Sequence, residues 1–169
     1  MDKINHFSKV PENRTAVDNI LRVNHGNQMR LNLMADAKAN IMITVASIVF
    51  SITIANLDNE VMRWPLLTFA FGCFFALLFA IFAIIPKTDY PKDGTGDIDR
   101  KSPLFNPLFF GHFAHLPIEE YKEDYAETLM TDDSVYDAMA GDIYGQGKIL
   151  ALRKYRFLKW SYMSFLSGM

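Results

Sequence analysis

The chain has 169 residues, a formal net charge of −2, 50% hydrophobic residues and 21% charged residues, averages that are typical of a small soluble domain. The distribution of the apolar residues argues against that class, because six of the fourteen Phe lie between Phe69 and Phe82 and no charged residue occurs from Trp64 to Pro86. The single Cys, Cys73, lies in the same apolar stretch, which excludes a disulfide framework and a Cys-based metal site.

The charges are divided unevenly along the chain. Residues 1–40 carry a net +2, residues 58–64 carry −1, residues 87–147 carry −8 and residues 148–169 carry +5. A uniformly basic chain would favour nucleic acid as a partner, and this division does not. No nucleic-acid partner is therefore predicted.

Residues 1–38 are predicted to form an N-terminal cytoplasmic helical arm. From Glu12 to Trp64 there is no Pro and only one Gly, so a helix that begins near Asn13 is expected to run without interruption into the first apolar segment. A polar stretch, residues 24–28, interrupts its apolar seam. Two interpretations remain open for this stretch: a site where a polar ligand or partner meets side-chain amides, and a polar layer that sets the register of a helical bundle.

Residues 39–86 are predicted to form a transmembrane hairpin of two helices. The segment Leu66–Ile85 has thirteen Leu, Ile or Phe in twenty residues, which match a bilayer core of about 30 Å and contribute about −4 to −8 kcal/mol to insertion. The segment Ala39–Leu57 has the right length but is more polar. Because residues 58–65 are too few for any other connection, the two helices are expected to be antiparallel. Only Arg63 of the Lys and Arg residues lies in that connection, so both long arms are predicted to be cytoplasmic.

Each predicted span carries one distinctive helix face. On the first span the 4, 3, 4 spacing of four polar residues indicates a face that meets another helix or a water-filled path, while the apolar face meets lipid. On the second span small residues repeat every four positions, a pattern that lets helices approach closely. This stripe is predicted to be an oligomerisation face, with packing against the first span as the open alternative. The polar face consists of Asn40, Thr44, Ser47 and Ser51, and the small stripe of Gly72, Ala76 and Ala80.

After the spans, residues 87–103 are predicted to be a polar linker and residues 104–156 a cytoplasmic helical region. In this region we expect a brief helix within the aromatic stretch 104–115, a helix that opens at Pro117 and runs to about Met130, and a last helix capped by Thr131. His112 and His115 are interpreted as packing or surface residues, because the vicinity supplies too few ligands for a metal. No metal site, no catalytic residue and no enzymatic activity are predicted.

Residues 157–169 are predicted to be a membrane-anchoring C-terminal helix. Thirteen residues rise only about 20 Å as a helix, so this segment is an incomplete third span or a half-inserted anchor. The predicted fold class is therefore an all-α membrane protein: a transmembrane helical hairpin with cytoplasmic helical arms and a partial C-terminal third membrane helix.

Three segments, in the same order along the chain, carry a resemblance to a known family. They read RLNLMADAKANIMITVASIV over residues 30–49, FFGHF over residues 109–113 and DIYGQGKILALRKYRFLKWSY over residues 142–162. With the surrounding residues 15–165, they resemble the transmembrane effector family of the Pycsar antiphage system. The resemblance implies a protein of the bacterial inner membrane that is paired with a pyrimidine cyclase. It further implies that cyclic UMP or cyclic CMP activates the protein to impair the membrane and kill the infected cell. No cofactor is predicted besides this ligand.

The resemblance and the sequence together give a hypothesis for the ligand site. A cyclic nucleotide has one negative charge and a base edge, so its site should offer cations, amide or carboxylate partners and a stacking surface. The alternative for each basic residue is contact with lipid headgroups or structural pairing. The predicted cations are Arg30, Lys38, Lys148, Arg153 and Lys154, the polar partners are Asn24, Asn27 and Asp36, and the stacking residues are Tyr144 and Tyr155.

Two functions from different classes follow. The first is a cyclic-nucleotide effector that assembles as a homo-oligomer in the membrane. The second is a membrane-anchored scaffold or regulator that binds a protein partner through its acidic helices and forms no lesion.

Overall fold

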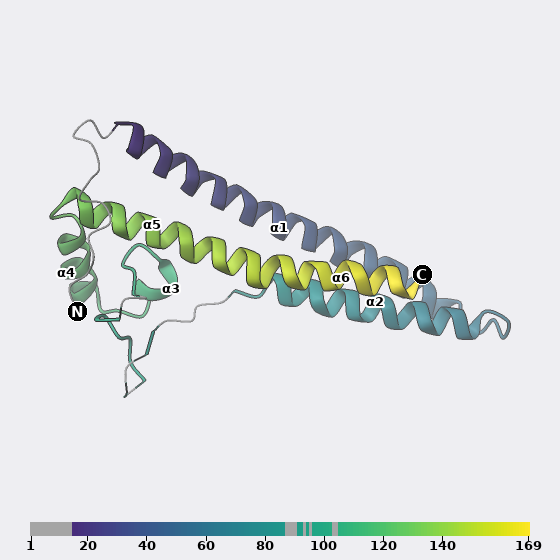
Figure 1. Ribbon diagram of the computed structural model, residues 1–169. Helices are drawn as coiled ribbons and strands as arrows, with labels where there is room; N and C mark the ends of the chain where they lie inside the picture. Colours follow the sequence, from purple (N-terminus) through teal and green to yellow (C-terminus); the bar gives the residue numbers. More distant parts are fainter. Residues whose placement is uncertain (1–14, 87–90, 93, 95, 103–104) are drawn as a thin grey trace. The chain divides into compact units, whose positions relative to one another are not determined.

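The computed structural model describes residues 15–86, 91–92, 94, 96–102 and 105–169 (Figure 1). These residues are helical apart from turns and one isolated antiparallel bridge between Lys92 and Ile98, which confirms the all-α prediction for the described part of the chain. Residues 1–14 and much of the predicted linker 87–103 lie outside the description. The helices are α1 (Thr15–Ala55), α2 (Arg63–Ile84), α3 (Phe110–Phe113), α4 (Ile118–Thr128), α5 (Asp132–Ile149), the π-helix η1 (Leu150–Lys154) and α6 (Tyr155–Gly168).

The chain forms two compact units. The arm unit consists of residues 1–27 and 86–146, and the bundle unit consists of residues 28–85 and 147–169. These divisions differ from the predicted segment ends at residues 38 and 156. The bundle unit begins earlier on α1 because Gln28 already lies beside Gly147 and Ala35 is buried.

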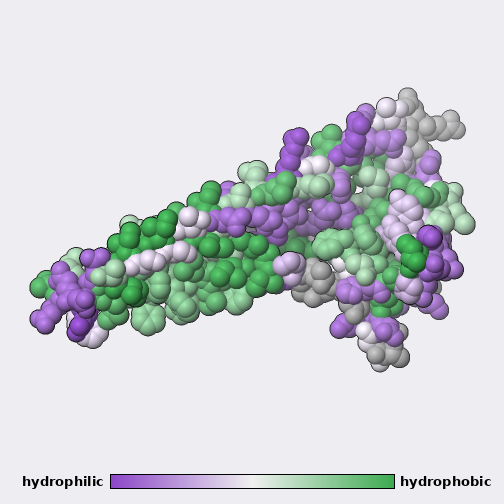
Figure 2. All heavy atoms as spheres, turned by 180° about the vertical axis from the view of Figure 1, so that it is seen from behind, coloured by the Kyte–Doolittle hydropathy of each residue, from purple (hydrophilic) through white to green (hydrophobic). Residues whose placement is uncertain are grey.

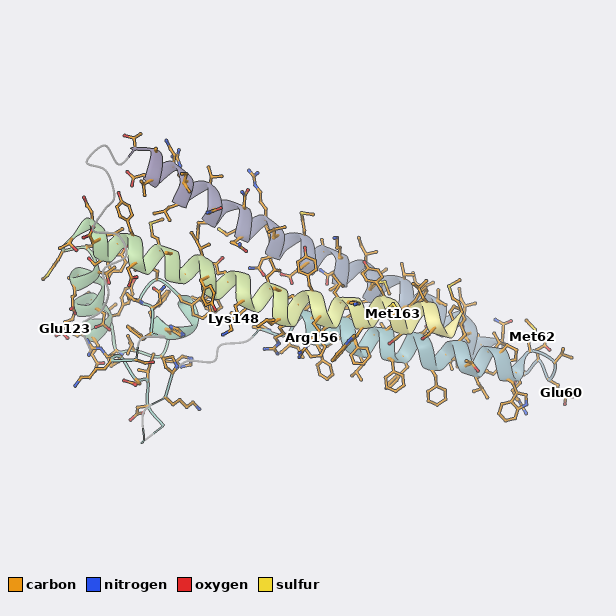
Figure 3. The ribbon with its side chains drawn as sticks, in the orientation of Figure 1. Glu60, Met62, Glu123, Lys148, Arg156 and Met163 are labelled. Atoms are coloured by element: carbon orange, nitrogen blue, oxygen red, sulfur yellow. The ribbon has the colours of Figure 1, made fainter. Side chains whose placement is uncertain are left out.

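The long helix α1 is continuous over 41 residues, as predicted from the absence of Pro. Its hydroxyl groups are largely satisfied within the helix: Thr44, Ser51 and Thr53 each donate a hydrogen bond to the carbonyl oxygen four residues earlier, at 2.7 to 2.9 Å. The turn after α1 is closed by the side chain of Asn59, whose Oδ1 accepts from the backbone N–H of Val61 at 3.1 Å. Glu60 and Met62 are labelled at this turn in Figure 3.

In the bundle unit, α1, α2 and α6 pack around small residues. One cluster joins Met42 and Ala46 of α1 to Ala76 and Ala80 of α2, with Phe165 of α6 against it. A second cluster joins Ala39, Ala83 and Leu158. The earlier residue 39 of α1 clusters with the later residue 83 of α2, and the later residues 42 and 46 cluster with the earlier residues 76 and 80, so the two helices run antiparallel.

Helix α6 lies along α2 (Figure 1). The hydroxyl of Ser161, which is fully buried, donates a hydrogen bond of 2.7 Å to the carbonyl oxygen of Ala76. Aromatic rings also pack between α2 and α6. The ring centroids of Phe79 and Trp160 are 5.5 Å apart, and those of Phe69 and Phe165 are 5.9 Å apart. The segment predicted as a short C-terminal helix is therefore the third member of the bundle.

The small stripe of α2 is occupied within the chain, which corrects its interpretation as a face open to another copy. A Cβ atom on Gly72 would lie 2.7 Å from the Cα of Gly168 and 2.9 Å from the carbonyl oxygen of Ser164. Ala76 and Ala80 are fully buried. The alternative of intramolecular packing holds, with α6 as a partner in addition to the first span, because α6 covers the side of the stripe that α1 leaves open.

The outer surface of the bundle unit is apolar. Ile48, Ile52 and Phe71 are all more than half exposed, and Figure 2 shows apolar side chains over the bundle with hydrophilic ones at the α1–α2 turn. Both α1 and α2 are long and apolar enough to cross a membrane. Such a continuous exposed apolar surface is typical of a protein that resides in a bilayer.

In the arm unit, Arg100 fixes α4. Its guanidinium donates to Asp124 at 2.7 and 2.9 Å and to Glu120 at 3.1 Å. The hydrogen bond with Asp124 is the main cause that raises the pKa of Arg100 above its usual value. A single cation thus pairs with part of the acidic charge that the sequence concentrates in this region.

The aromatic stretch and α5 follow the predictions. Thr131 caps α5, because its Oγ1 accepts from the backbone N–H of Ser134 at 3.2 Å. His112 is a packing residue: its Nδ1 accepts from the backbone N–H of Asn106 at 3.0 Å, and its ring lies 4.9 Å from that of Phe109. Burial lowers the pKa of His112, which favours the neutral ring that this hydrogen bond requires.

Candidate functional site

Cations are concentrated at the end of the bundle unit that lies away from the α1–α2 turn. Residues 28–57 and 147–169 contain seven Lys and Arg but only one acid, Asp36. Figure 3 labels Lys148 and Arg156 of this group, on the helical run that leads into α6. A group of this composition is suited to an anion. The seven cations are Arg30, Lys38, Lys148, Arg153, Lys154, Arg156 and Lys159.

The one acid of this region is paired with Lys154. The ammonium group of Lys154 donates to both carboxylate oxygens of Asp36, at 2.7 and 2.9 Å. The side chains are 18% and 36% exposed, so the pair is only partly screened by solvent. It joins α1 to η1 one turn before the apolar cluster of Ala39 and Leu158, which places it at the border between the polar and apolar parts of the bundle unit.

Lys154 is the last residue of the π-helix η1. A π-helix has a wider turn than an α-helix, is rare, and is frequently found at functional sites. The wider turn changes the direction in which Lys154 and the following residues point. The sequence contains no signal for it, because Leu150–Lys154 reads as ordinary α-helix.

Aromatic rings lie next to two other cations. The ammonium group of Lys38 lies 5.9 Å from the centroid of the Tyr155 ring. The guanidinium of Arg156 lies 5.3 Å from the centroid of the Trp160 ring. A ring face stabilises a cation without neutralising its charge, so both cations retain the capacity to attract an anion.

Gln28 contributes an acceptor that the predicted ligand set lacks. Its Oε1 is buried and has no hydrogen-bond partner among the described residues. Gly147 lies beside it, and a Cβ atom on Gly147 would be 3.6 Å from Nε2 of Gln28. A buried carbonyl without a donor is uncommon and costs free energy, so a partner that supplies an N–H group would be favourable.

The structure brings together four of the predicted ligand residues: Asp36 with Lys154, and Lys38 with Tyr155. Arg30, Lys148 and Arg153 belong to the same bundle unit, the first two exposed and the third half-buried. The other three, Asn24, Asn27 and Tyr144, belong to the arm unit and are exposed there. In this structure Lys154 pairs with Asp36, which is the alternative of structural pairing that the sequence left open for each basic residue.

The polar stretch of α1 forms a polar layer within the arm unit. His25 Nε2 lies 3.4 Å from Oδ2 of Asp142, which also accepts from Nε2 of Gln146 at 2.7 Å. About two helix turns before this pair on each helix, the hydroxyl of Tyr136 donates a hydrogen bond to Asp18 at 2.8 Å. These contacts agree with the interpretation of this stretch as a polar layer that sets the helix register. The contact across the layer is made by His25 and not by the neighbouring amide side chains.

We expect the stability of the arm unit to fall as pH rises because of Asp142. Burial raises the pKa of this carboxyl, and His25 and Gln146 offset the effect only in part. An unfolded Asp titrates near about 3.9, so above that value the folded chain binds more protons than the unfolded chain, and stability is lost through the folded pKa. Asp142→Asn should remove this slope in thermal unfolding scans from about pH 4 to pH 8. Asp137→Asn, an exposed position on the same helix, should retain it; an unchanged slope in Asp142→Asn would contradict the assignment.

The comparison with known families decides the identity of the chain. A family model described as the Pycsar effector protein domain matches residues 19–169, nearly the whole chain. The chain belongs to the Pycsar effector family. No curated protein and no solved structure matches the chain significantly.

Membership confirms the resemblance seen in the sequence. The family consists of antiphage defence effectors, and it implies membrane association and a cyclic-nucleotide signal from a partner cyclase. The domain is a transmembrane effector and not a known catalytic fold. The two long apolar helices and the cation-rich end of the bundle unit are the features of this chain that fit a membrane effector with an anionic signal.

Proposed function

We propose that this effector binds cyclic UMP or cyclic CMP at the cation-rich end of the bundle unit and then impairs the bacterial inner membrane. The observation that carries the proposal is the ion pair of Asp36 and Lys154. Asp36 is the one acidic residue among the seven cations of this end, and the pair lies where the apolar part of the bundle begins. Family membership supports the class of signal. The consequence for the cell is abortive infection, in which the infected cell dies before phage mature.

The proposal includes a membrane arrangement, which the packing of the bundle supports. The apolar part of α1 and the whole of α2 cross the bilayer as a hairpin, and α6 is the third membrane helix alongside α2. The cation-rich end lies on the cytoplasmic side, with both long arms, since Lys and Arg are retained there. This end therefore faces the compartment in which a cyclase releases its product.

Ligand recognition is a competition for Lys154. The cyclic phosphate is an anion that can replace the Asp36 carboxylate at the ammonium group, with charge-assisted hydrogen bonds of similar strength. The ring of Tyr155, already next to Lys38, offers a face to the pyrimidine. The buried carbonyl of Gln28 lies eight residues before Asp36 on α1, about 12 Å along the helix axis, so it is not a partner of a base held on Tyr155.

Release of Asp36 links binding to the membrane. The pair joins α1 to η1, so its loss removes a polar tie between α1 and the helical run that ends in α6. A ligand that binds only the untied arrangement shifts the population toward it. The bundle then rearranges within the bilayer, which is the step that impairs the membrane.

The test is calorimetry on purified protein in nanodiscs of neutral lipid. We expect binding of cyclic UMP or cyclic CMP and no binding of cyclic AMP or cyclic GMP. The same titrations are repeated in nanodiscs that contain anionic lipid. If the protein associates with anionic lipid but binds no nucleotide in either lipid, the cations are assigned to lipid headgroups. Absence of binding to every cyclic nucleotide in both lipid compositions would overturn the proposal and favour the scaffold function.

A further inference from the structure

The membrane part of α1 has three distinct faces. The first, with Ala39, Met42 and Ala46, is buried against α2 and α6. The second is apolar and exposed, and the third is polar. The apolar face consists of Ile41, Val45, Ile48 and Ile52, and the polar face of Asn40, Thr44, Ser47 and Ser51, each one position earlier.

Among the described residues, no helix of the bundle unit packs against the polar face. At 3.6 residues per turn it lies roughly 130° around the helix from the buried face. Asn40, Thr44 and Ser51 are exposed and Ser47 is half-buried. Thr44 and Ser51 bond back to their own helix, but the side chains of Asn40 and Ser47 make no hydrogen bond within the described part of the chain.

A polar face of this kind is unfavourable against lipid. Hydrocarbon offers no partner to an amide or a hydroxyl, and polar residues in membrane helices therefore face a protein interior or water. The bundle unit already has three helices packed together, and none of them covers this face. Another helix that supplies donors and acceptors at the same depth would satisfy it.

We propose that the polar face of α1 is the contact with a second copy of this chain. Copies inserted in the same orientation place Asn40, Ser47 and the other residues of the face at equal depths, so each residue meets its own counterpart. An amide carries both donors and an acceptor, so Asn40 is complementary to Asn40. The 4, 3, 4 spacing is also that of the seam between two parallel helices, in which a buried Asn fixes the register.

The seam continues beyond the polar residues. The same spacing, continued toward the N-terminus, places Ala37 and Leu33 on this face, and Leu33 is 67% exposed. Leu33 is an exposed apolar side chain just before the polar residues of this face. A second copy of α1 would cover it. The inference rests on one part of the proposed function, that α1 crosses the membrane, and is independent of which nucleotide is bound.

The test is thiol cross-linking in native membranes, with and without cyclic UMP and cyclic CMP. Single Cys residues are placed on the polar face by Thr44→Cys, Ser47→Cys and Ser51→Cys. Matched controls one residue further on, Val45→Cys, Ile48→Cys and Ile52→Cys, lie at nearly the same depth on the apolar face. The native Cys73 is fully buried and provides the unsubstituted control.

We expect cross-linked dimers from the polar-face variants in at least one of these conditions, and background amounts from the matched controls. Dimers that are equal on both faces, or absent from all six variants in every condition, would overturn the proposal. Labelling of the same thiols by a membrane-impermeant maleimide separates this failure from that of the membrane assignment, because residues inside the bilayer react slowly. Face-specific dimers that form equally with and without nucleotide would support the contact.

Discussion

Lys154→Met should abolish the response to the cyclic pyrimidine nucleotide, whereas Asp36→Asn should increase it. Lys154 supplies the charge-assisted hydrogen bonds to the phosphate, and Asp36 competes with the phosphate for the same ammonium group. A lost hydrogen bond to a charged group costs about 1.5 to 3 kcal/mol, so Lys154→Met should weaken binding by about 10- to 150-fold. A partly exposed ion pair contributes about 1 kcal/mol at most, so Asp36→Asn should strengthen binding by up to about fivefold.

The opposite directions distinguish a ligand switch from a merely structural ion pair. If the pair only held α1 and η1 together, both substitutions would reduce stability and response alike. Binding is measured by calorimetry, and the cellular response by the amount of cyclase that arrests growth. Lys122→Met is the matched control, because it removes the same charge from an exposed position of α4, outside the cation-rich end, and should change neither. Equal losses in Lys154→Met and Asp36→Asn would reject the competition.

Gly72→Ala should destabilise the bundle unit through a clash between α2 and α6. The added Cβ would lie 2.7 Å from the Cα of Gly168 and 2.9 Å from the carbonyl oxygen of Ser164. Both are backbone atoms in the last turn of α6, so this turn must move away from α2, and the buried hydrogen bond from Ser161, three residues before Ser164, is strained with it. Overpacking of this kind costs about 1 to 3 kcal/mol.

Gly145→Ala is the control for Gly72→Ala. A Cβ on Gly145 meets nothing within 4 Å, and Ala is about 1 kcal/mol more favourable than Gly inside a helix. This variant should be as stable as the native chain or more so. Thermal unfolding in one detergent compares the two, and a Gly72→Ala variant with native stability would show that α6 is not held against α2 as described.

The helices themselves were predictable from local residue patterns. The absence of Pro from residue 12 to residue 64 predicts the continuous α1, and the charge-free run of Phe, Leu and Ile predicts α2. Thr131 predicts the start of α5. Each of these features depends on neighbouring residues alone. Local physics therefore determines the elements and the apolar character of the bundle.

The arrangement of the candidate site was less predictable. Asp36 and Lys154 are 118 positions apart, and their contact depends on the register of α6 against α1 and α2. The π-helix that precedes α6 has no composition signal. The stripe of Gly72 gives close packing but not the identity of its partner, because any small surface of suitable shape fits such a stripe.

The central claim is that the chain itself converts a cyclic pyrimidine nucleotide into membrane damage. It is tested most directly by purified protein in liposomes loaded with a self-quenching dye. Cyclic UMP or cyclic CMP should release the dye from vesicles that contain the native chain, while cyclic AMP and cyclic GMP should not, and Lys154→Met should remain silent. Intact vesicles with either pyrimidine nucleotide, at concentrations that saturate binding, would contradict the claim.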